Sequence, residues 1–273
     1  MATKRLPVVL LLLTILLVAA QAIPAQKVTI PAQSMTGTEL QLPGVLHKPS
    51  GDGPFPAVVM LCGCEGYATD PDATQQSSWA ERLVGWGYVA LQLDSFGPRG
   101  FPNGVCDNTN IVNDAMRSDD AYAAKSYLST LRFVDPKNIA AIGWSHGGWA
   151  VMKIIDGYVR DKKVGPFKAA IAIYPYCSPP LEPDTPVLVL IGEKDDWCPA
   201  SLAESLKEEY TTNNWKPEFA LKVYPNAYHA FDYETTKPGG IDFMGHHIEY
   251  DPEATSDAIA QTKAFLAKYC LAK

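Results

Sequence analysis

The sequence predicts an α/β protein with a mostly parallel central sheet and helices on both faces. Short apolar segments alternate with amphipathic ones along the chain, which is the pattern of strands and helices that follow one another in turn. Most of the apolar segments are unbroken, as in strands that are buried on both faces of a sheet. The composition, 47% hydrophobic and 19% charged over 273 residues, is that of an ordinary globular protein.

The first 22 residues have the pattern of a secretory signal peptide. Lys4 and Arg5 precede an apolar run over residues 6–20, and a small-x-small cleavage pattern ends at Ala22. A helix made by this run is about 22 Å long, shorter than the roughly 30 Å hydrocarbon core, which argues against an uncleaved membrane anchor. We therefore expect a signal peptide over residues 1–22, one domain over residues 23–273, a secreted or periplasmic protein, and no stable membrane insertion.

The charge balance excludes one class of partner. The net charge is −7 and no basic run is present. An acidic chain repels phosphate backbones, so nucleic-acid binding is not expected. The sequence leaves the oligomeric state open.

Six cysteines allow one to three disulfides in an oxidising compartment, and the sequence does not choose among the pairings. Cys62 and Cys64 are one residue apart, a spacing that can also bind metal. No second pair of Cys or His at zinc spacing accompanies them, so we expect no metal.

The first elements are strands. Residues 27–30 and 39–46 have the pattern of an opening hairpin. Pro43 argues that the second of these strands lies at an edge or carries a bulge, because proline cannot donate to a ladder. Residues 57–61 (AVVML) form the first unbroken apolar run, which predicts a fully buried strand.

A helix and a further strand come next. Ser78 and Glu81 have the spacing of a capping box, which predicts that a helix begins there. Its apolar face consists of Trp79, Leu83 and Trp86. Residues 88–93 form the strand that follows.

The middle of the chain predicts a long helix over residues 113–131, because apolar residues recur there at spacings of three and four and Asp135-Pro136 follows. A buried strand is expected over residues 139–143 and a helix from about Gly148.

The last third repeats this alternation. Strands are expected over residues 169–174, 187–191 and 219–224, and a helix over residues 201–210. Pro252 opens a terminal helix, whose apolar face consists of Ile259, Thr262, Phe265, Leu266 and Tyr269.

The strand over residues 139–143 ends in the motif G-x-S-x-G, with Ser145 at its centre. A sharp strand-to-helix turn exposes such a serine, and small residues two positions away let the turn close. The positive end of the helix dipole favours negative charge at the hydroxyl. We therefore predict Ser145 as a nucleophile.

A nucleophilic serine needs a base, and the base needs an acid that orients it. Ligands of parallel sheets bind beyond the carboxyl ends of the strands. His229 follows the last predicted strand there, whereas His246 and His247 lie in a polar loop. Asp195 and Asp196 follow another strand. We expect His229 as the base and Asp195 as the acid, with Asp196 as the alternative.

The oxyanion of an acyl-transfer reaction needs two N–H donors. One is expected from the backbone of His146, whose side chain the helix turn directs away. The other is expected from the loop after residues 57–61, where we nominate the backbone N–H of Cys64.

These segments resemble the dienelactone hydrolase family within the α/β-hydrolase fold. The matching stretches are AVVMLCGCEG, DSFGPRG, GWSHGG, IGEKDDWCP and YPNAYHAF. The resemblance implies an α/β-hydrolase of a single domain that acts on small-molecule esters or lactones without a cofactor. It favours Asp195, which stands four residues before Pro199. It also implies a candidate disulfide, Cys64–Cys106. Cys177 and Cys198 are a second candidate pair, because they lie in neighbouring strand-end loops.

Two departures from the family qualify the substrate. The enzyme that names the family uses a cysteine nucleophile and binds a carboxylate with arginines. Arg99 can match one of these arginines and would then bind substrate. The alternative is that Arg99 forms a structural ion pair within its loop. Where a second arginine is expected, the chain has Asp232-Tyr233-Glu234. A broader ester substrate is therefore expected.

Aromatic residues flank the predicted site loops. Tyr67 and Trp144 are predicted to bind substrate, and further candidates are Phe96, Tyr176, Trp197 and Tyr228. The alternative for each is plain packing. Taken together, the sequence predicts a secreted serine hydrolase of carboxylic esters or lactones that works through an acyl-enzyme. The alternatives are a peptidase or amidase on the same fold, and a binding protein on a hydrolase scaffold.

Overall fold

A computed structural model describes residues 24–34, 37–66, 75–158, 164–236 and 238–270. The predicted signal peptide and Tyr67 lie outside the described residues. Within the part of the chain that is described, no helix is both long and apolar enough to cross a bilayer.

One eight-stranded sheet organises the molecule, in the order β1-β2-β4-β3-β5-β6-β7-β8. Strands β3 to β8 pair in parallel, whereas β2 pairs antiparallel with β1 and with β4. The mostly parallel sheet predicted from the sequence is confirmed. Its strands are β1 Gln26–Gln33, β2 Glu39–His47, β3 Phe55–Leu61, β4 Val89–Leu93, β5 Val134–Trp144, β6 Ala170–Ile173, β7 Val187–Gly192 and β8 Phe219–Tyr224.

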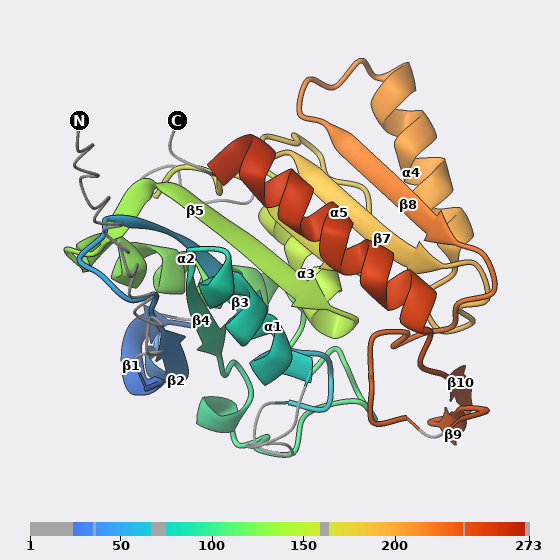
Figure 1. Cartoon of the computed structure of the whole chain (residues 1–273), viewed down its shortest axis with the longest axis horizontal. Helices are drawn as coiled ribbons and strands as arrows, with labels where there is room; N and C mark the ends of the chain where they lie inside the picture. Colours follow the sequence, from blue (N-terminus) through green and yellow to red (C-terminus); the bar gives the residue numbers. More distant parts are fainter. Residues whose placement is uncertain (1–23, 35–36, 67–74, 159–163, 237, 271–273) are drawn as a thin grey trace, which may run out of the picture.

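Helices cover both faces of this sheet (Figure 1). Helices α1 and α5 share one face, where the Lys263 ammonium lies over the Trp86 ring at 5.7 Å. Helices α2 and α3 pack together on the other face, and the Tyr122 hydroxyl donates to the Ile154 carbonyl at 2.9 Å. The helices are α1 Gln75–Gly85, α2 Asp114–Thr130, α3 His146–Ile154, α4 Ala200–Thr212 and α5 Pro252–Cys270.

The helices on both faces explain why the inner strands have no polar side. Every residue of β4, β6 and β7 is buried. Strand β8 lies at the edge of the sheet, where Lys222 is exposed and the apolar run is interrupted. The predicted buried strands are thereby confirmed, with β5 extended toward its beginning through Pro136.

Two predicted details of the elements differ. Pro43 does not lie in an edge strand, because β2 pairs on both sides. The β2–β4 ladder begins only at Gly44, so the missing N–H of Pro43 costs no bond there, and its carbonyl accepts from the Asp94 N–H at 2.9 Å. Ser78 does not begin a helix, since α1 already includes Gln75.

The N-terminus of α2 follows the sequence closely. Asn113 is its N-cap, and the side-chain oxygen accepts from the Met116 N–H at 3.1 Å. Leu131 is its C-cap. The predicted limits of this helix therefore correspond to its two capping residues.

A small hairpin, β9 Ile241–Phe243 paired with β10 His246–Ile248, was not predicted. Met244 and Gly245 join the two strands, both with positive φ, as in a type I′ turn. Gly245, which adopts positive φ readily, is the sequence signal for such a turn. His246 and His247 therefore belong to a strand rather than to a polar loop.

Candidate active site

The loops after the parallel strands meet at one edge of the sheet. Cys64 follows β3, Ser145 follows β5, Tyr174 follows β6, Asp195 follows β7 and His229 follows β8. Because parallel strands end at the same edge, residues from five distant parts of the chain come together there.

Ser145 stands at the turn between β5 and α3 in a strained conformation. Its φ is 51° and its ψ is −115°, outside the regions that L-residues favour. The turn also brings backbones into close approach: a Cβ at Gly143 would meet the Gly147 carbonyl oxygen at 2.2 Å, and one at Gly147 would meet the Leu61 carbonyl oxygen at 2.1 Å. The glycines of the motif are thus required by sterics.

This crowding predicts a large effect of Gly147→Ala on stability. The new methyl group would collide with rigid backbone of β3, so we expect the free energy of unfolding to fall by about 3 kcal/mol. Gly85→Ala is the matched control, since a Cβ there has no atom within 4 Å and should change stability by less than about 1 kcal/mol. Chemical denaturation of both variants measures the difference, and equal stabilities would contradict the steric account.

Ser145, His229 and Asp195 form one hydrogen-bonded chain. The His229 Nε2 lies 2.9 Å from the Ser145 Oγ, and its Nδ1 lies 2.7 Å from the Asp195 Oδ2. The Asp195 and His229 side chains are buried. The side chain of Asp196 is 55% exposed and contacts His246 instead, at 3.2 Å.

Backbone donors hold the Asp195 carboxylate in this position. Its Oδ1 accepts from the N–H groups of Trp197 at 3.0 Å and Cys198 at 2.7 Å, which leaves Oδ2 for His229. The two strand-end loops also touch, because a Cβ at Gly192 would meet the Ala227 carbonyl oxygen at 2.3 Å. A tight turn after β7 therefore sets the distance between the Asp195 carboxylate and the His229 imidazole.

The His146 side chain points away from Ser145, as predicted. Its Nδ1 accepts from the Arg117 guanidinium at 2.6 Å, so Nε2 carries the proton and donates to the Thr109 carbonyl at 3.0 Å. Burial, and then the Arg117 charge, lower the pKa of His146 to about 3. Arg117 is fully buried and also donates to the Cys62 carbonyl at 2.8 Å, a role that the sequence analysis missed.

The neutral His146 predicts an acid-sensitive contribution to stability. The unfolded chain binds a proton near pH 6.5 and the folded chain only near pH 3, so stability is lost as pH falls through that interval. The slope from this group is at most about 1.4 kcal/mol per pH unit. We expect His146→Gln to remove it, which denaturation of both proteins at several pH values would measure. Parallel curves would contradict the assignment.

The loop after β3 is fixed by a disulfide. Cys64 and Cys106 are bonded, which confirms the pairing that the resemblance implies. The Val105 N–H donates to the Cys64 carbonyl at 2.7 Å. The pairing Cys177–Cys198 is wrong: both residues are buried free thiols, and burial raises the pKa of Cys177 to about 12.

Glu65 is a site residue that the sequence analysis did not single out. It lines the same cavity as Ser145 and His229. Desolvation raises the pKa of its carboxyl, and hydrogen bonds from its own N–H and that of Gly63 oppose this rise. A Cβ at Gly63 would meet the Glu65 Oε2 at 2.3 Å, so this glycine leaves room for the carboxylate.

Arg99 does not face the site. Its two terminal nitrogens donate to both carboxylate oxygens of Asp120, at 2.8 and 2.9 Å, and one also donates to the Ser95 carbonyl at 2.7 Å. These bonds engage the guanidinium in a bidentate pair with a buried carboxylate. The structure therefore contains the structural ion pair that was the alternative for Arg99, with a partner from α2 rather than from its own loop.

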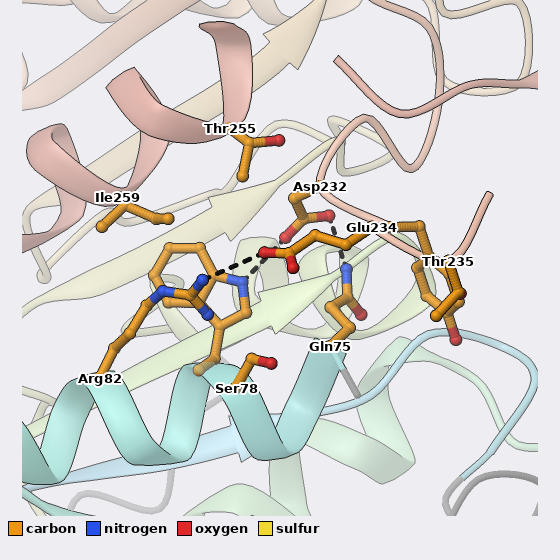
Figure 2. A pocket seen from close by; sticks show the side chains of 10 residues that line it. Gln75, Ser78, Arg82, Asp232, Glu234, Thr235, Thr255 and Ile259 are labelled. Carbon is orange, nitrogen blue, oxygen red and sulfur yellow. Dashed lines mark hydrogen bonds and ion pairs between the residues drawn. The ribbon is translucent and has the colours of Figure 1, made fainter. Parts of the chain in front are cut away.

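Asp232 is buried beneath His229 with a full set of donors. Its Oδ1 accepts from Gln75 and from the Tyr174 hydroxyl, both at 2.6 Å, and its Oδ2 accepts from the indoles of Trp79 at 2.9 Å and Trp144 at 3.0 Å. Figure 2 shows Gln75 of α1 pointing toward this carboxylate. The Tyr174 ring then packs on the His229 imidazole, with centroids 4.7 Å apart. Asp232 is thus linked to the His229 imidazole through Tyr174.

Two cavities meet at Ser145. The one we call the hairpin cavity has a volume of about 340 Å³ and includes His229, Trp144 and the hairpin residues Ile241, Phe243 and Ile248. The one we call the α3 cavity also measures about 340 Å³ and is lined by Thr109, Asn110, His146, Trp149, Tyr176 and Cys198. Cys64, Ser145 and Trp197 line both.

The predicted aromatic residues divide between these cavities and the packed interior. Trp144 and Trp197 line the hairpin cavity, and Tyr176 lines the α3 cavity. Phe96 is buried under the Arg117 guanidinium, 4.6 Å from it. Tyr228 packs edge-on against His247, with centroids 4.5 Å apart.

A metal centre is not apparent among the described residues. The only group of metal-type ligands that lies close together there is Cys64, Glu65 and Cys106. Its two sulfur atoms are bonded to each other, so they are not thiolate ligands.

One family model matches most of the chain. The model of the dienelactone hydrolase family matches residues 42–270. The chain is 26% identical over 219 residues to Lipase 1 of Moraxella sp. (strain TA144), a match that covers 76% of this chain but 61% of that protein.

Solved structures show the same fold. A dienelactone hydrolase-like promiscuous phosphotriesterase from metagenomic libraries superposes with a TM-score of 0.70 at 20% identity, covering 91% of this chain and 99% of that one. The esterase Est2 of Thermogutta terrifontis gives 0.62 at 17% identity, covering 89% and 92%. These likenesses establish the α/β-hydrolase fold.

Proposed function

The chain belongs to the dienelactone hydrolase family, and we propose that it is a serine hydrolase of carboxylic esters or lactones. The single observation that carries this proposal is the chain of hydrogen bonds from the Ser145 hydroxyl through His229 to the Asp195 carboxylate. A hydroxyl that lines a cavity, a base within reach of its proton and a buried acid behind the base are the parts that nucleophilic acyl transfer needs.

In the proposed reaction His229 Nε2 takes the proton of Ser145 as the oxygen attacks the substrate carbonyl. Asp195 accepts from Nδ1–H, which fixes the tautomer and stabilises the imidazolium that forms. His229 then protonates the leaving oxygen, and an acyl group stays on Ser145. A water molecule activated by the same histidine releases the acid.

Two backbone N–H groups are proposed to bind the oxyanion. The N–H of His146 is the first of α3, and first-turn N–H groups have no acceptor within their own helix. The N–H of Cys64 belongs to the loop that its disulfide and the Val105 hydrogen bond hold in place. Each such donor typically lowers the barrier by about 2.7–4 kcal/mol.

The charges of the site favour an uncharged substrate. Among the described residues, neither cavity is lined by Lys or Arg. Arg99 is engaged by Asp120, and Glu65 adds a carboxyl group to the hairpin cavity. A substrate that carries carboxylates would be buried without a cationic partner, at a cost of several kcal/mol. We therefore propose neutral esters or lactones.

Secretion is part of the proposal. Cleavage after Ala22 would release a single domain over residues 23–273 outside the cytoplasm. The Cys64–Cys106 disulfide supports an oxidising compartment, since such bonds are rare where thiols are kept reduced.

A serine-directed fluorophosphonate tests the proposal. We expect one adduct, on Ser145, in the intact mass and in the peptide map of the native protein. Ester and amide pairs with the same acyl group then separate an esterase from an amidase. A protein that forms no adduct and hydrolyses neither compound would instead be a binding protein on this scaffold.

A further inference from the structure

We propose that the two cavities divide the ester between them: the hairpin cavity binds the alcohol half and the α3 cavity binds the acyl half. The inference rests on the proposed function of Ser145 and His229. It makes β9 and β10 the element that selects the leaving group, an uncharged alcohol with an apolar part.

The proton transfer decides which half lies where. The leaving oxygen must receive its proton from His229 Nε2, the atom that lies 2.9 Å from the Ser145 Oγ. The alcohol half must therefore lie on the His229 side of the attacked carbonyl. His229 lines the hairpin cavity. It is not among the described residues that line the α3 cavity.

The acyl half is then left on the opposite side of Ser145. The α3 cavity begins at Ser145 and His146 and continues past Trp149 and Tyr176, whose rings contact edge to face with centroids 6.1 Å apart. The acyl group would still occupy the α3 cavity after the alcohol has left, because this group remains bonded to Ser145. Trp197 and Cys64 line both cavities, so they would flank the reacting carbonyl where the cavities meet.

The hairpin is held against the catalytic histidine. Ile248 forms a β-bridge with His229. The Trp197 ring contacts two imidazoles: it is stacked on His246 with centroids 4.6 Å apart and tilted against His229 at 5.1 Å. The side chains that the hairpin presents to the cavity are all apolar: Ile241, Phe243 and Ile248. They would contact the alcohol half by burial of apolar surface.

Phe243→Ala and Tyr176→Ala form a matched pair of variants. Both side chains are aromatic and partly exposed, 38% and 47%, so neither substitution should prevent folding. One ester series keeps the acyl group and lengthens the alcohol, and the other keeps the alcohol and lengthens the acyl group. In each protein the readout is kcat/KM for the longest ester relative to the shortest of that series.

We expect Phe243→Ala to lower this ratio about 5- to 10-fold in the alcohol series and to leave the acyl series unchanged. Tyr176→Ala should do the reverse. The rate of deacylation, measured after the burst of released alcohol, should change only in Tyr176→Ala, because the alcohol has left before that step.

Each other result overturns the division. Exchanged effects would assign the acyl half to the hairpin cavity, and effects of both variants on both series would mean one shared site. No effect of either variant would mean that the cavities do not bind the ester. A failure of the proposed function is distinct from all of these, because the unsubstituted protein would then hydrolyse no ester and show no burst.

Discussion

Ser145→Ala is expected to abolish ester hydrolysis, with a fall in kcat of about 10⁵- to 10⁶-fold. The substitution removes the oxygen that would form the acyl-enzyme and leaves the Cβ in place. Hydrolysis of a short nitrophenyl ester gives the rate. Because the strained turn keeps the same backbone and nearly the same side-chain volume, the unfolding temperature should be close to that of the unsubstituted protein.

Ser201→Ala is a suitable control for this variant. Ser201 is exposed on α4 and lies in neither cavity, so its loss should change neither rate nor stability. Retained activity in a folded Ser145→Ala protein would exclude the serine mechanism. If Ser145→Ala lost activity because it failed to fold, its unfolding curve would show this. The curve therefore separates loss of the nucleophile from loss of the folded state.

Asp195→Asn is expected to lower kcat by about 10⁴-fold at nearly unchanged size and packing. The N–H groups of Trp197 and Cys198 would hold the amide oxygen, so the amide NH2 would face His229 Nδ1 and donate to it. The imidazole would then carry its proton on Nε2, the tautomer that cannot take the proton of Ser145. The same nitrophenyl ester measures the loss. The rate constant for labelling by a fluorophosphonate should fall as well, because that reaction also requires an activated serine.

The neighbouring residue offers a control of the same chemistry. Asp196→Asn removes an equal charge one position along the chain, where the side chain is exposed and contacts His246 rather than His229. We expect a change of less than about 3-fold, because exposed ion pairs contribute little. Similar losses in the two variants would mean that net charge near the site, not the hydrogen bond to His229, supports the rate.

The sequence analysis anticipated the convergence of Ser145, His229 and Asp195 better than the contacts of the residues around them. Ser145, His229 and Asp195 each follow an apolar strand, and strands of a parallel sheet must end at a common edge, so their convergence follows from a local pattern. The choice of Asp195 over Asp196 rested instead on the resemblance, through the spacing of Asp195 from Pro199.

The supporting residues carry no comparable signal. Arg117 lies inside α2 and reads as an ordinary exposed helical residue until the helix is packed against the loop of Cys62. The sequence analysis considered Asp232 only because it stands where the family has a second arginine. In the structure its carboxylate accepts four hydrogen bonds, from α1, β5 and the loop after β6. Such contacts join segments far apart in the chain, and no periodicity records them.

The sequence alone determined the strand–helix alternation, the steric need for small residues around Ser145 and the three groups that would carry the chemistry. These follow from backbone geometry and from burial, which act over a few residues. Only the tertiary structure decided that Arg99 pairs with Asp120, that Cys177 and Cys198 remain thiols, and that a hairpin closes one of two cavities beside Ser145. Those outcomes depend on distances between elements that the packing of the whole sheet and its helices sets.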